Sequence, residues 1–170
     1  MGGYTVGVLV QTNFGGVLQV DGVPVGEALK KFSFSNQLLQ DVDGSCMIVV
    51  ATDAPLDHRN LLRLAKRAML GLGKTGGIAS NGSGDYVIAF STAAALRIPY
   101  QADSALHTTP ILLNDVVSPI FMAAIEATEE AIINSLFAAE TMKGKSGHVI
   151  EALPVDKLIS LLKQYNKIKK

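Results

Sequence analysis

Short apolar runs alternate along this chain with longer stretches of helical periodicity. The segments 4–11, 45–51 and 86–91 are rich in apolar and β-branched side chains and are bounded by glycine or polar residues, which predicts three strands. Segment 17–25 reads Val-Leu-Gln-Val, Asp-Gly, Val-Pro-Val. An Asp-Gly pair between apolar residues predicts a hairpin with a type I′ turn, and a short helix is expected over 26–31.

Three longer helices are predicted from apolar residues that recur every three or four positions. The first spans 57–72, with Asp57 as its N-cap. The second lies within 114–142, where Pro119 indicates a break or restart near Ser118. The third covers 155–165. Because no internal repeat or low-complexity linker interrupts this order, residues 1–170 are expected to form a single α/β (α+β) domain with helices packed on a sheet.

Composition and charge exclude several classes of partner. The 170 residues include 15 Lys and Arg against 15 Asp and Glu, so no basic field favours nucleic acid. No apolar stretch approaches the roughly 18 residues of a membrane span, and the N-terminus lacks the pattern of a signal peptide. We therefore expect no nucleic acid, no membrane and a cytoplasmic location.

Metal and thiol chemistry are both disfavoured by the positions of the histidines and the cysteine. His58, His107 and His148 are far apart and lack metal-ligand spacing, so no metal or other cofactor is predicted. The single cysteine, Cys46, follows Ser45 in a predicted strand, where alternation directs it to the opposite face. A buried, inert thiol is the simpler interpretation.

The dipeptide Gly44-Ser45 is the strongest candidate for chemistry. It follows the polar segment 35–43 and opens an apolar strand, where a serine freed by cleavage of its own peptide bond could act as an N-terminal nucleophile. The α-amino group so released has a reference pKa of about 7.7–8.0, close to working pH, and would serve as the base. A Gly-Ser pair before a strand is also ordinary turn chemistry, and the local pattern leaves both interpretations open.

Four sequence blocks, in order, resemble the DmpA-like family of self-processing aminopeptidases, the L-aminopeptidase/D-esterase and β-peptidyl aminopeptidase group. Residues 44–56, Gly-Ser-Cys-Met-Ile-Val-Val-Ala-Thr-Asp-Ala-Pro-Leu, resemble its nucleophile strand. Residues 4–13, Tyr-Thr-Val-Gly-Val-Leu-Val-Gln-Thr-Asn, resemble its oxyanion strand. Ser-Asn-Gly-Ser-Gly-Asp at 80–85 with Ala-Phe-Ser-Thr at 89–92 resembles its amine-binding loop, and 136–142 with 152–154 its terminal helix pair.

This resemblance covers about residues 2–165 but only the second half of a family member. It implies an αββα sandwich of the type shared with ornithine acetyltransferases and related to N-terminal nucleophile hydrolases, incomplete in this chain. It also implies self-cleavage between Gly44 and Ser45, which would separate residues 1–44, the end of the α-chain part, from residues 45–170, the β-chain part.

The resemblance further assigns roles to individual residues. Ser45 matches the nucleophile, Asn13 the oxyanion-hole asparagine, and Ser83 a serine that orients the nucleophile's amine. Asp85 falls where the family carries an acidic residue that binds the substrate's free ammonium group. Without the match, Asn13 would be a turn residue before Phe14-Gly15-Gly16, and 80–85 a glycine-rich turn.

Three functions are compatible with these residues. The first is a self-processing serine hydrolase, an aminopeptidase that releases N-terminal residues from short peptides, amides or esters through an acyl-enzyme on Ser45. The second is a non-catalytic C-terminal module that lacks the N-terminal half of the family. The third is an acyltransferase of related fold. Ser45 argues against this function, because those enzymes have threonine as the N-terminal residue after self-cleavage. The expected partners are a small substrate, the N-terminal half, and further copies in a homo-oligomer.

Overall fold

The structure, a computed structural model, describes residues 3–32, 44–101 and 104–169. The polar segment 35–43 expected before Gly44 lies outside these residues. The centre is a three-stranded sheet in the order β1–β2–β3. Strand β1 (Val6–Asn13) runs antiparallel to β2 (Ser45–Thr52), and β3 (Tyr86–Ser91) runs parallel to β2. All three strands fall where the sequence predicts them.

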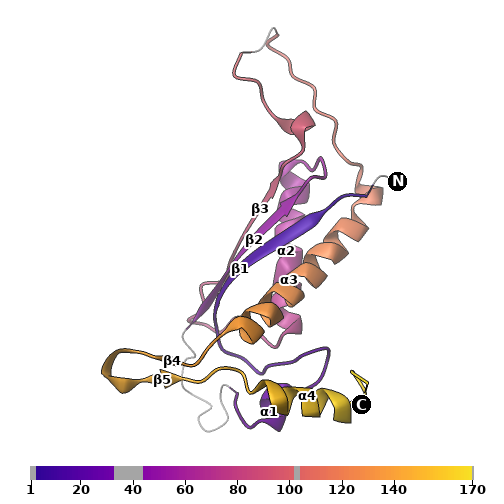
Figure 1. Cartoon of the computed structure of the whole chain (residues 1–170). Helices are drawn as coiled ribbons and strands as arrows, with labels where there is room; N and C mark the ends of the chain where they lie inside the picture. Colours follow the sequence, from indigo (N-terminus) through magenta and orange to yellow (C-terminus); the bar gives the residue numbers. More distant parts are fainter. Residues whose placement is uncertain (1–2, 33–43, 102–103, 170) are drawn as a thin grey trace.

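Two long helices run alongside these strands and cover one face of the sheet (Figure 1). Helix α2 (His58–Lys74) begins where Asp57 accepts a hydrogen bond from the Asn60 amide, which confirms the expected N-cap. Helix α3 (Ser118–Ala138) follows a 3-10 turn at Asn114–Val116, so the break expected near Pro119 is also present. The helix ends at Ala138 rather than at residue 142.

Strand alternation divides the sheet into two unlike faces. The inner face packs against α2 and α3 and forms the main core, with Cys46, Ile48 and Val50 fully buried. The outer face carries Leu9, Met47, Tyr86, Ile88 and Phe90, all of which are exposed in the described part of the chain.

A second, smaller core lies at one end of the molecule, where α1 (Val25–Ala28) meets α4 (Val155–Gln164) (Figure 1). The expected hairpin over 17–25 is reduced to one bridged pair, Val20 and Val23. Its turn is nevertheless of the predicted kind, because Asp21 and Gly22 have φ of 50° and 74°.

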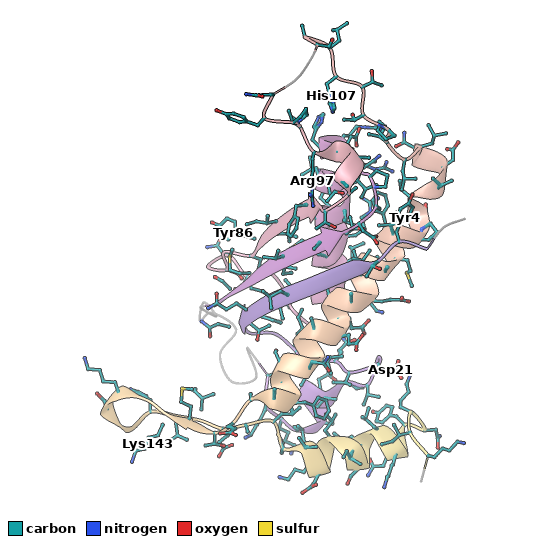
Figure 2. The ribbon with its side chains drawn as sticks, turned by 45° about the horizontal axis from the view of Figure 1, so that its top comes forward. Tyr4, Asp21, Tyr86, Arg97, His107 and Lys143 are labelled. Atoms are coloured by element: carbon teal, nitrogen blue, oxygen red, sulfur yellow. The ribbon has the colours of Figure 1, made fainter. Side chains whose placement is uncertain are left out.

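Two connections were not anticipated. A small hairpin of β4 (Met142–Lys143) and β5 (Val149–Ile150), with a 3-10 turn at Lys145–Gly147, lies between α3 and α4. Between β3 and α3, residues 92–101, with a 3-10 turn at Ala94–Leu96, and residues 104–113 project beyond the sheet and carry Arg97 and His107 (Figure 2). Among the described residues, no helix combines the length and apolarity needed to cross a bilayer.

Candidate active site

The candidate site lies at the end of the sheet where β1 finishes and β2 begins. Asn13, the last residue of β1, lies directly opposite Ser45, the first residue of β2. Directly opposed residues on antiparallel strands point to the same face of a sheet. In both strands this is the face that α2 and α3 do not cover.

The loop before β3 reaches this strand end through its main chain. The Gly84 amide donates a hydrogen bond of 3.0 Å to Ser45 Oγ. Residues 84 and 45 come together because β3 pairs in parallel with β2, with Tyr86 beside Met47. The Tyr86 ring borders the loop on the exposed face of the sheet (Figure 2), with Cε2 3.2 Å from the position that a Cβ on Gly84 would take.

Asp85 joins the loop to β2. Its Oδ1 accepts a hydrogen bond of 2.8 Å from the Cys46 amide, and its Oδ2 accepts one of 2.7 Å from Ser83 Oγ. Hydrogen bonds to an ionised carboxylate are among the stronger ones in proteins. The structure therefore holds the loop of Ser83 and Asp85 against the start of β2 by two hydrogen bonds to its residues, one at Ser45 Oγ and one at the Cys46 amide, with Asn13 on the adjacent strand. The contacts of the Gly84 and Cys46 amides were missed, because a backbone amide has no signature in the sequence.

Gly44 occupies a position that only glycine fits. Its φ is 147°, a conformation that other residues rarely adopt. A Cβ at this position would stand 2.3 Å from the Asn13 carbonyl oxygen and 2.9 Å from Phe14 Cα. The chain therefore passes in close contact with the end of β1 immediately before Ser45.

Cys46 is a poor candidate for nucleophile. Its side chain is fully buried on the inner face, as alternation predicts. Burial, and secondarily the negative charge of Asp85, raises the pKa of its thiol to about 11. Because the thiolate is the reactive form of cysteine, this thiol is almost entirely unreactive at neutral pH.

No described group of His, Cys, Asp and Glu side chains has the arrangement of a metal site. The three histidines lie on separate segments: His58 is the first residue of α2, His107 lies on the projecting segment, and His148 lies within the small hairpin, directly before β5. A cavity of about 430 Å³ opens beside Asn13, with mainly apolar walls that include Phe14, Leu18 and Leu136.

Comparison with known proteins gives a consistent result. The model of peptidase family S58 matches residues 1–150. A β-peptidyl aminopeptidase, BapA, of Sphingosinicella microcystinivorans is 44% identical over 179 residues, which cover 97% of this chain and 44% of that protein.

Solved structures agree with the sequence comparison. The crystal structure of a protein from Pyrococcus horikoshii superposes with a TM-score of 0.83 and 46% identity, over 96% of this chain and 43% of that one. The L-aminopeptidase D-Ala-esterase/amidase of Ochrobactrum anthropi is described as a variant of the Ntn hydrolase fold. It superposes with a TM-score of 0.77 and 29% identity, over 96% of this chain and 49% of that one. The predicted fold class is therefore confirmed, and the chain spans less than half the length of each of these proteins.

Proposed function

Because the chain belongs to peptidase family S58, we propose that it is the catalytic part of a self-processing serine aminopeptidase with Ser45 as nucleophile. One observation carries the proposal. Ser45 Oγ stands at the first residue of β2, hydrogen-bonded by the Gly84 amide at 3.0 Å, and the only residue type that fits before it is glycine. The similarity to a β-peptidyl aminopeptidase supports the same class of reaction.

The first step of the scheme is self-cleavage. Ser45 Oγ attacks the carbonyl carbon of Gly44, the Oγ–C bond forms, the Gly44–Ser45 peptide bond breaks, and the hydroxyl proton ends on the Ser45 nitrogen. Water then hydrolyses the resulting ester, which yields a Gly44 carboxylate and restores the Ser45 hydroxyl. The products are residues 1–44 and residues 45–170, the latter with a free α-amino group beside the nucleophile.

The second step is turnover of substrate. The free amine of Ser45, with a reference pKa of about 7.7–8.0, accepts the hydroxyl proton as Oγ attacks a substrate carbonyl. Asn13 lies opposite Ser45 in the strand register, on the same face, where its side-chain amide can donate to the developing oxyanion. Loss of one such donor typically lowers kcat by about 10²–10³. Water resolves the acyl-enzyme.

Ser83 and Asp85 complete the scheme. Ser83 donates a hydrogen bond to Asp85, so its oxygen is left to accept one from the Ser45 amine and to orient that amine. Asp85 would bind the ammonium group of a substrate with a free N-terminus. A carboxylate offers about four acceptor positions, and Asp85 gives one from each oxygen to Cys46 and Ser83.

The proposed reaction needs a further polypeptide segment that covers the site. The chain spans less than half of its relatives, and the sheet face that carries Ser45 is uncovered in the described residues. We propose that a segment equivalent to the relatives' other half covers this face and completes a pocket for short peptides, amides or esters. The same uncovered face favours the second candidate function, a module that folds without catalysing any reaction.

The two functions are separated by the intact mass of freshly purified and aged protein. Self-processing predicts two species, residues 1–44 and 45–170, and a Ser45→Ala variant that stays uncut. The measurement is repeated after the chain has been combined with the N-terminal half of a family member. A single uncut chain under both conditions contradicts the aminopeptidase and supports the module.

A further inference from the structure

The outer face of the sheet carries a second row of side chains directly beside the candidate nucleophile. Strand pairing places Gln11, Met47 and Tyr86 side by side across β1, β2 and β3. Ser45 and Asn13 form the adjoining row, two positions away along their strands. Residues two positions apart on a strand point to the same face and are about 7 Å apart, a distance that a long side chain can span. The second row is therefore within reach of a molecule bound at Ser45.

Tyr86 is the residue of this row whose side chain extends to the nucleophile. A Cβ placed on Gly84 would stand 3.4 Å from Ser45 Oγ, 3.2 Å from Tyr86 Cε2 and 3.8 Å from the Tyr86 hydroxyl oxygen. The end of the phenol ring and the candidate reactive oxygen thus border the same point in space. Because Tyr86 is 63% exposed on the open face of the sheet (Figure 2), a bound molecule can contact its ring.

The absence of a side chain at Gly84 leaves this point open. Gly84 is not among the glycines with positive φ, so its backbone conformation is one that other residues can adopt. An alanine methyl group here would meet Ser45 Oγ and the Tyr86 ring at van der Waals distance or slightly closer. Glycine therefore provides room between the nucleophile and the ring rather than an unusual turn.

The proposed scheme identifies which part of a substrate enters this space. Ser45 Oγ attacks the carbonyl carbon of the substrate's N-terminal residue, and Asp85, the chain neighbour of Tyr86, binds the ammonium group of that residue. The side chain of the same residue is attached between these two groups. On the β3 side of the site it therefore meets the Tyr86 ring.

We infer that Tyr86 is a specificity-determining residue, whose ring bounds the space beside Gly84 and limits the size of the N-terminal side chain that a substrate can carry. The inference rests on the proposed function and adds a specificity residue to it. Ligand pockets are lined mainly by apolar and aromatic side chains, and one methylene group in such a pocket changes kcat/KM by about 10–200-fold. Removal of the ring should change which substrates are accepted rather than abolish the reaction.

The first test compares kcat/KM for the p-nitroanilides of glycine, alanine and leucine. Where the chain alone shows no turnover, it is combined with the N-terminal half of a family member. Tyr86→Ala should raise the ratio of leucine to alanine hydrolysis at least about tenfold. Tyr86→Phe keeps the ring and should keep the ratio. Ile88→Ala, in the next row of the same face and strand, is the matched control and should also leave the ratio unaltered.

A complementary variant fills the space from the opposite side. Gly84→Ala retains the main-chain amide that donates to Ser45 Oγ and adds one methyl group beside it. It should lower the ratio of alanine to glycine hydrolysis about tenfold, because the substrate's own methyl group competes for the same room.

The second test requires no turnover. The chain has four tyrosines, and labelling with 3-fluorotyrosine makes each visible by fluorine NMR. Substitution by phenylalanine identifies the signals of Tyr86 and of Tyr165, which follows α4. Alanine, a product of the proposed reaction, should shift the Tyr86 signal at about 10 mM and leave the Tyr165 signal unchanged.

The outcomes separate this inference from the proposed function. Turnover by Tyr86→Ala with an unchanged substrate ratio overturns the inference and leaves the aminopeptidase in place. An equal change in Tyr86→Phe or Ile88→Ala also overturns it, as does a Gly84→Ala variant with an unchanged ratio. A chain without turnover whose Tyr86 signal responds to alanine contradicts the aminopeptidase and supports Tyr86 as the wall of a binding site. A Tyr86 signal that does not respond overturns the inference, whatever the turnover.

Discussion

The two faces of the central sheet are built from the same three strands and differ in almost every other respect. On the inner face Cys46, Ile48 and Val50 are fully buried beneath α2 and α3. On the outer face Leu9 is 71% exposed and Ile88 56% exposed. The candidate reactive groups, Ser45 and Asn13, belong to this outer face. Because side chains alternate along the strands, the apolar residues that stabilise the fold lie on one face and the residues that would perform the reaction lie on the other.

The largest expected effect compares the two neighbours at the start of β2. Ser45→Ala should reduce hydrolysis of amino-acid p-nitroanilides by more than about 10³-fold, because the nucleophile is lost. Cys46→Ala, on the inner face, should retain most activity. Where the chain alone shows no turnover, both variants are assayed with the N-terminal half of a family member. Loss on Cys46→Ala alone, with the variant folded, would identify a thiol enzyme.

For stability, unlike activity, a substitution on the inner face should have a larger effect than one on the outer face. Ile48→Ala removes a fully buried side chain and should lower the free energy of unfolding by about 2–5 kcal/mol. Ile88→Ala makes the same change on the exposed face of the adjacent strand and should cost less than about 1 kcal/mol. Urea titration of both variants measures the difference. Equal losses would mean that the outer face is covered in solution.

A smaller effect is expected from Asp85→Asn. If Asp85 binds the substrate ammonium, kcat/KM for substrates with a free N-terminus should fall by about 10–100-fold through KM, since a charge-assisted bond contributes about 1.5–3 kcal/mol. Substrates with an acetylated N-terminus should lose less. Asp53→Asn is the matched control, because Asp53 also accepts a backbone amide, that of Thr5, at the other end of β2. An equal loss on both substrate types would indicate that Asp85 acts only by holding the Cys46 amide and Ser83 in place through its hydrogen bonds.

The smallest effect is a pH dependence of stability. The thiol of Cys46 has a pKa of about 11 in the folded protein, raised by burial from 9.0. A raised pKa of this kind adds stability below pH 9, and the stability is lost as pH rises toward 11. Between pH 8 and 10.5 the unchanged chain should lose about 1–2 kcal/mol more than Cys46→Ala. Parallel losses in the two proteins would indicate that the thiol is accessible to solvent.

Much of the inner face could be predicted because it depends on local pattern. The apolar runs gave all three strands, Asp57 marked the start of α2, and Pro119 marked the break before α3. The positions of Ser45 and Cys46 on opposite faces followed from strand alternation. These features need only the order of residues within about ten positions.

The rest depends on contacts between distant residues. Gly84 and Ser45 are 39 positions apart, and their hydrogen bond arises only from the parallel register of β2 and β3. The hairpin between Met142 and Ile150 pairs only two residues on each strand, too few to produce a recognisable alternation. The roles of Ser45, Asn13, Ser83 and Asp85 came from the family resemblance and stay predictions until the variants are measured.

The antiparallel pairing of β1 with β2 also determines how the processed protein would respond to dilution. Strand β1 precedes the proposed cut and β2 follows it, yet they pair along eight residues each, from Val6 opposite Thr52 to Asn13 opposite Ser45. Before cleavage this pairing is intramolecular and independent of protein concentration. After cleavage it joins two separate molecules, so the folded state follows mass action and its melting temperature rises with concentration. Cleavage of one peptide bond would thus change refolding from a unimolecular process into a bimolecular one, in which residues 1–44 and 45–170 must associate.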